Sequence, residues 1–252
     1  MKKIFIVGIL AILFSSNINA WPKWVKYVGE DFGGAIAGAQ IGAQVTLGNP
    51  LGISAGIVAG GVCRSVWVYH WDHNLRKNMN NGNTGIPLDS YEKVGYIHNQ
   101  VVGSFINEHP DGYPNIAMLS DVIYEPIVSS FATVYGIEKQ DVYSILSKQS
   151  FVNEMNKLSS VGDIQQNALI IKNTYGDEKL SSFYMGIMNR LISAHNNNYD
   201  LKINIDNFCQ TEILNIENTA NYSAKEKDIL KYSINILKYS YNFWFVNKLD
   251  LN

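Results

Sequence analysis

The segment from Phe32 to Cys63 constrains the fold most, because its 32 residues contain no Asp, Glu, Lys, Arg or His. Glycines recur in it every four residues on both sides of a Gly-Asn-Pro turn signal. Small residues four apart share one helix face and let two backbones approach closely. The sequence therefore predicts two helices, over about residues 31–47 and 51–69, packed as an antiparallel hairpin through six glycines: Gly34, Gly38, Gly42, Gly52, Gly56 and Gly60.

The run from Gly34 to Gly60 resembles the glycine-zipper segments of bacterial membrane-active peptides and of some uncharacterised secreted bacterial proteins. This resemblance implies close helix packing, together with membrane insertion or self-association of a bacteriocin-like or toxin-like kind. It carries over no catalytic residue. Four tryptophans flank the run and are typical of a membrane-interface belt: Trp21, Trp24, Trp67 and Trp71.

The first twenty residues have the pattern of a secretory signal peptide. Lys2 and Lys3 form a basic start, residues 4–14 are apolar or glycine, and Ala20 closes the segment. The apolar part would reach only about 17 Å as a helix, whereas a bilayer core is roughly 30 Å thick. We therefore expect export to the periplasm, the cell surface or the medium, with a mature chain that begins near Trp21.

Charge and cysteine content limit the possible partners. Without Lys2 and Lys3, eighteen basic residues face twenty-two acidic ones, and no basic patch indicates a nucleic-acid partner. An exported chain can form disulfides, so Cys63 and Cys209 are either a bridge or two buried free thiols.

Beyond the hairpin segment (residues 21–77), a polar stretch at 78–89 is predicted as a linker or loop before an all-helical domain at 90–252. Asp89 with Glu92, and Ser223 with Glu226, have the spacing of helix N-terminal caps. Further helices are expected near 115–135, 138–148, 150–160, 163–173 and 206–219, and from residue 177 onward. The fold class is therefore all-α, with the hairpin followed by a multi-helix domain.

Candidate catalytic and metal-binding motifs are weak. Gly52 to Gly56 matches Gly-x-Ser-x-Gly, but the glycine periodicity already explains both glycines. His70 and His73 could share a helix face and hold a metal, yet no further ligand has a diagnostic spacing. Asp121 and Glu125 lie one helical turn apart, and we interpret them as part of a solvent-exposed helix face. The sequence thus predicts neither an enzyme nor a cofactor.

A single imidazole stands out from its apolar surroundings. His98 is interpreted as a structural histidine that takes hydrogen bonds from a neighbouring helix.

Two interpretations of the hairpin remain open. In the first, it associates with a membrane or with itself. In the second, it is buried in the core of a soluble extracytoplasmic binding module whose protein partner is unknown. Burial of four isoleucines by residues after Ser90 would favour the second interpretation, and an exposed apolar patch the first: Ile36, Ile41, Ile53 and Ile57.

Overall fold

The computed structural model describes residues 23–71, 85–87, 89–110, 119–158, 164–196 and 204–246. Ten α-helices and no strand lie within these residues, which confirms the all-α class. The helices are α2 (Lys23–Val45), α3 (Pro50–Trp71), α4 (Ser90–Glu108), α5 (Leu119–Tyr135), α6 (Lys139–Leu146), α7 (Gln149–Leu158), α8 (Ile164–Tyr175), α9 (Glu178–Asn196), α10 (Ile205–Asn218) and α11 (Ala224–Val246).

Several predicted features lie outside the described residues. They are the signal peptide, Trp21, His73 and most of the linker at 78–89. The side chains of His70, Trp71 and Asp121 lie outside them as well. The predicted division into a hairpin, a linker and a helical domain stays a prediction.

Local capping explains where the later helices begin. The Asp89 carboxylate accepts hydrogen bonds from the backbone N–H groups of Tyr91 and Glu92, and α4 starts at Ser90, directly after Asp89. Ser223 and Glu226 form the reciprocal bonds of a capping box at the start of α11. At α10 the cap is Asn204, whose side chain accepts from the N–H of Asn207, so the helix starts one residue before Asp206.

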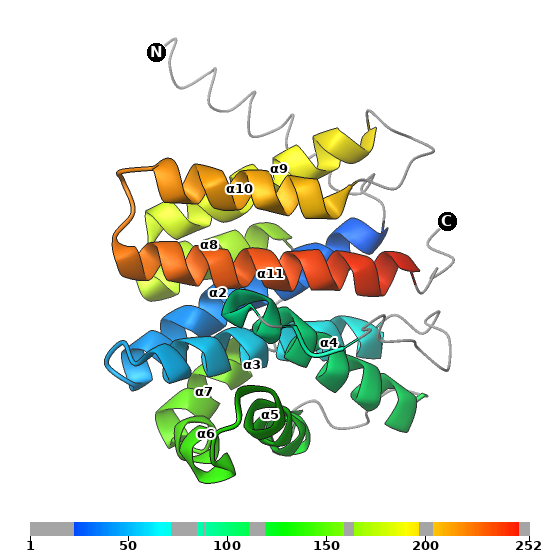
Figure 1. The fold of residues 1–252 in the computed structure, drawn as a ribbon, viewed down its shortest axis with the longest axis vertical. Helices are drawn as coiled ribbons and strands as arrows, with labels where there is room; N and C mark the ends of the chain where they lie inside the picture. Colours follow the sequence, from blue (N-terminus) through cyan, green and yellow to red (C-terminus); the bar gives the residue numbers. More distant parts are fainter. Residues whose placement is uncertain are drawn as a thin grey trace.

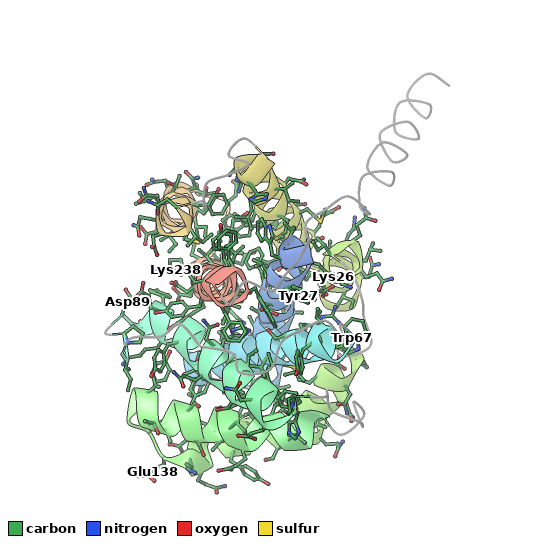
Figure 2. The ribbon with its side chains drawn as sticks, turned by 90° about the vertical axis from the view of Figure 1, so that its right-hand side faces the viewer. Lys26, Tyr27, Trp67, Asp89, Glu138 and Lys238 are labelled. Carbon is green, nitrogen blue, oxygen red and sulfur yellow. The ribbon has the colours of Figure 1, made fainter. Side chains whose placement is uncertain are left out.

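Helices α2 and α3 pack against each other as an antiparallel pair and lie in the interior of the molecule (Figure 1). Both are longer than the uncharged run predicts, with 23 and 22 residues, or about 34 and 33 Å. Helix α2 begins eight residues early because apolar side chains in its first turns, such as Val25 and Tyr27, are buried. Figure 2 shows Tyr27 on this helix, inside the molecule.

The later helices cover this pair on several sides. Helices α7, α8, α9 and α11 contact α2, and helices α4, α5, α6, α7 and α11 contact α3. As a result all four isoleucines named above are buried. Helix α10, by contrast, packs mainly on α11 and lies at the periphery (Figure 1).

Candidate functional site

The six glycines bring the α2 and α3 backbones into direct contact. A Cβ placed at Gly38 would overlap the carbonyl group of Gly56, and one placed at Gly56 would overlap that of Gly38. The same holds for Gly34 and Gly60, and a Cβ placed at Gly42 would overlap the carbonyl group of Gly52, whereas one placed at Gly52 would overlap the Thr46 side chain. The glycine faces are therefore occupied within one chain in this fold.

A buried ion pair continues this helix contact one turn beyond Gly34 and Gly60. Arg64 donates from Nε and Nη2 to Glu30 Oε2, with Nε at 3.0 Å, and from Nη1 to the Leu158 carbonyl at 2.8 Å. Asn167 Nδ2 donates to the same Glu30 oxygen at 2.6 Å. The pair thus ties α2 and α3 to both α7 and α8.

Burial dominates the electrostatics of this pair. Both side chains are fully shielded from solvent. Burial raises the pKa of the Glu30 carboxyl, while Arg64 and Asn167 oppose that rise. Glu30 Oε1 has no hydrogen-bond partner among the described residues. Because an arginine is always charged, the pair is electrically neutral only while Glu30 is ionised.

Asp31, the next residue, is the centre of a second buried polar cluster. Its carboxylate accepts hydrogen bonds from Ser65 at 2.5 Å, Ser240 at 2.6 Å and the Trp244 indole N–H at 2.8 Å. His98 Nε2 lies 3.1 Å from Ser65 Oγ and 3.6 Å from Asp31 Oδ2. The cluster thereby joins α2 to α3, α4 and α11.

The hydrogen bonds of Asn99 determine which ring nitrogen of His98 carries a proton. Asn99 Nδ2 donates to the Tyr239 carbonyl at 2.9 Å, so its Oδ1, 3.0 Å from His98 Nδ1, must accept from that nitrogen. His98 Nε2 therefore faces the Ser65 hydroxyl, which itself donates to Asp31 Oδ1.

Burial raises the pKa of Asp31, while the nearby His98 and the hydrogen-bond donors Ser240, Ser65 and Trp244 oppose that rise. The order of groups differs from that of a nucleophilic triad, in which histidine lies between serine and the acid. All three side chains are also fully shielded from solvent.

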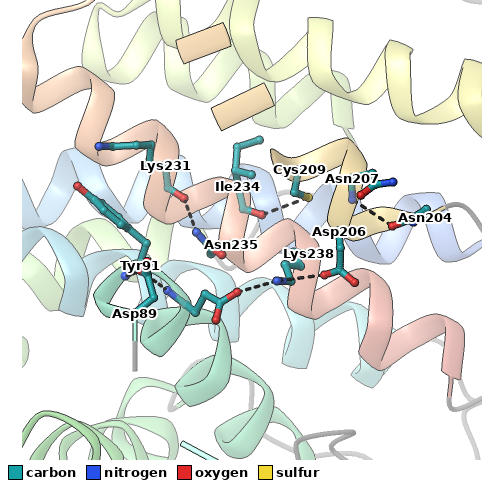
Figure 3. A network of polar contacts seen from close by, with 11 residues as sticks. Asp89, Tyr91, Asn204, Asp206, Asn207, Cys209, Lys231, Ile234, Asn235 and Lys238 are labelled. Atoms are coloured by element: carbon teal, nitrogen blue, oxygen red, sulfur yellow. Dashed lines mark hydrogen bonds and ion pairs between the residues drawn. The ribbon is translucent and has the colours of Figure 1, made fainter. Parts of the chain in front are cut away.

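A polar pocket of about 260 Å³ lies between α4, α10 and α11. Lys238 contacts Glu92 at 2.7 Å and Asp206 at 3.0 Å. Figure 3 marks the pair of Lys238 and Asp206 with a dashed line. Partial burial lowers the pKa of Lys238, but these two carboxylates outweigh it and raise the pKa above its ordinary value. Lys231 lies 4.5 Å above the Tyr91 ring in the same pocket. The pocket therefore presents fixed charges of both signs.

A second cleft, of about 480 Å³, separates α9 from α10. Arg190 donates to both carboxylate oxygens of Glu212, at 2.7 and 2.9 Å, and so links the two helices. Phe183 and Tyr222 pack edge to face in the lining of this cleft. The two clefts on either side of α10 are the candidate recognition surfaces, and no local pattern in the sequence indicates them.

The tryptophans named from the sequence are packed against the protein where they are described. Trp24 is buried and packs edge-on against His195 and Tyr241, with ring centroids 4.9 and 5.2 Å apart. Trp67 is partly buried below the Arg64 guanidinium, which lies 5.0 Å from the ring centroid.

The cysteine bridge left open by the sequence is not formed. Cys63 and Cys209 are both free and buried. Cys63 lies on α3, whereas Cys209 lies on α10 with its sulfur 3.9 Å from the Ile234 carbonyl of α11. Burial raises the pKa of Cys63 to about 12 and raises that of Cys209 as well, so both thiols are protonated and poorly reactive.

The other sequence candidates have structural roles where they are described. Ser54 lies inside α3, and its hydroxyl donates to the Pro50 and Leu51 carbonyls, so the Gly-x-Ser-x-Gly match is not at a strand-to-helix turn. Glu125 is exposed and pairs with Lys139. Among the described residues, no group of three or more His, Cys, Asp or Glu side chains could hold a metal ion.

Helix α3 is the one described helix that is long and apolar enough to cross a membrane, over Pro50–Tyr69 with a mean hydropathy of 1.5. Most of that stretch is buried inside the protein, as in the core helix of a water-soluble domain. Comparison with known proteins adds no relative, since no family model, curated protein or solved structure matches this chain.

Proposed function

We propose that this protein is an exported, soluble binding module whose glycine-rich hairpin forms its structural core. The observation that carries this proposal is the enclosure of α2 and α3, whose apolar side chains are covered by helices that follow Ser90. Glycine contacts and two buried polar clusters also bind the hairpin to the helices around it, so the hairpin is stabilised by packing inside the protein.

Recognition is assigned to the clefts beside α10. Helix α10 packs mainly on α11, so one side of it borders the polar pocket and the other borders the α9–α10 cleft. Ligand sites are commonly concave, with a few polar groups set among apolar ones. The Arg190–Glu212 pair beside Phe183 and Tyr222 has this character.

A second candidate function is membrane association by the hairpin itself, which the length and hydropathy of α3 favour. For that function the hairpin would have to separate from the surrounding helices. The contacts that the Glu30–Arg64 pair and the Asp31 cluster make with those helices would then be broken.

Dye release from liposomes, combined with thermal unfolding followed by circular dichroism, separates the two functions. For a soluble module, we expect no release by the wild type and unfolding of the whole chain by Gly38→Leu or Gly56→Leu. Gly186→Leu is the matched control, because a Cβ there meets only the flexible end of Arg190, at 3.3 Å. Release by the wild type, abolished by Gly38→Leu with helicity retained, would overturn the proposal in favour of membrane insertion.

A further inference from the structure

The turn between α2 and α3 has an unusual residue at its tightest point. Gly48 N–H donates to the Ala43 carbonyl at 2.7 Å and Leu47 N–H donates to the Gln44 carbonyl at 3.5 Å, which is the bonding of a Schellman helix end. In this motif the residue in the left-handed conformation is usually glycine. Here that residue is Leu47, with φ of 54°.

Leu47 is also 97% exposed, far more than the other exposed large apolar residues, of which the next is Leu169 at 54%. Exposing a leucine side chain to water does not stabilise the fold, and leucine is disfavoured at positive φ because its Cβ crowds the backbone. Neither conformation nor packing within the described fold therefore explains a leucine at this position. Backbone outliers of this kind are a reason to look for a function.

Two lysines border the turn. Lys148 Nζ donates to the Val45 carbonyl at 3.3 Å, and Lys225 Nζ lies 3.4 Å from the position a Cβ would take on Gly48. Both side chains are exposed, and neither forms a salt bridge with a carboxylate among the residues the structure describes. The hairpin tip, defined as residues 45–51, itself contains no charged residue. The tip therefore presents the exposed apolar side chain of Leu47, with the ammonium groups of two lysines beside the turn.

We propose that the hairpin tip is a contact site for an anionic lipid bilayer, with Leu47 in the interfacial region and Lys148 and Lys225 against the headgroup phosphates. A lipid surface fits because the tip is convex and presents one apolar side chain flanked by flexible cations. The tip lies at the periphery, where α2 meets α3, so the contact leaves the hairpin core folded (Figure 1). This proposal does not depend on the recognition function assigned to the α10 clefts.

An environment-sensitive fluorophore attached next to the hairpin tip tests the contact in the full chain. Gln44→Cys provides an exposed attachment point, since Cys63 and Cys209 are buried. With phosphatidylglycerol vesicles we expect a blue shift of its emission, and with phosphatidylcholine vesicles none. Lys148→Gln or Lys225→Gln should each weaken the vesicle affinity about fivefold, because one lysine near an anionic surface contributes about 1 kcal/mol.

Leu47→Asn is the decisive variant. Asparagine adopts the left-handed conformation more readily than leucine, so this variant should unfold at a higher temperature while it loses the blue shift. Loss of the shift then cannot result from misfolding. Leu169→Asn and Leu214→Asn remove exposed leucines elsewhere and should leave the shift unchanged. Absence of a shift on phosphatidylglycerol vesicles, or an equal shift in Leu47→Asn, overturns the proposal.

Discussion

Removing the charge of Glu30 should destabilise the protein far more than removing an exposed carboxylate. In Glu30→Gln the guanidinium of Arg64 stays buried and charged, keeps its bond to the Leu158 carbonyl, and loses its counter-ion. Breaking one side of a buried pair in this way costs about 3–5 kcal/mol. A domain is stable by only about 5–15 kcal/mol, so the loss is a large part of the total.

Glu125→Gln is the matched control, because it removes the same charge from an exposed pair with Lys139. Exposed pairs contribute about 0–1 kcal/mol, so this variant should be close to wild type. The double variant Glu30→Gln with Arg64→Met removes both buried charges and should recover part of the loss.

Urea unfolding followed by circular dichroism at pH 7 measures all of these changes as shifts in the free energy of unfolding. If Glu30→Gln cost no more than Glu125→Gln, the Glu30 carboxyl would already be neutral in the folded protein. The ion pair would then not be what holds α2 and α3 to α7 and α8.

Three further predictions concern other parts of the molecule. Because burial raises the pKa of Asp31, its contribution to stability is full below the unfolded-state pKa of about 3.9 and is lost as pH rises through the folded value. Asp31→Asn should therefore lose less stability than wild type as the pH rises above about 4, measured by urea unfolding; an unchanged pH profile contradicts this. Cys63 and Cys209 should resist alkylation in the native protein and react in urea without reductant, checked by mass spectrometry. Ser223→Ala should cost about 1 kcal/mol in thermal unfolding by removing the capping box of α11.

Local signals in the sequence were sufficient for the later helices. Capping residues such as Asp89 and Ser223 bond to residues within three positions along the chain, so the sequence shows the cap and its partner side by side. The glycine spacing likewise predicted helices on both sides of the turn, because the glycines and the turn residues are close in sequence.

The start of α2 and the polar clusters could not be predicted in the same way. Glu30 and Asp31 look like the charged edge of an apolar segment, and their partners are distant in the chain, up to Ser240 and Trp244. The left-handed conformation of Leu47 is likewise not indicated by the sequence, because the glycine beside it, Gly48, is the residue expected to adopt positive φ in the turn. The clefts beside α10 depend on how whole helices pack, which no local pattern encodes.

One long-range contact was nevertheless available from the sequence. Gly34, Gly38 and Gly42 meet Gly60, Gly56 and Gly52, so each step of four residues along α2 matches a step of four back along α3. One more step reaches Glu30 and Arg64, which are opposite in charge and do pair. In an antiparallel hairpin with a fixed turn, the pairing of positions near the turn also predicts the pairing of positions farther from it. Opposite charges at paired positions can therefore be predicted to contact each other. The same charges also weigh against a hairpin that inserts into lipid in this register, because both would leave water together with the glycines.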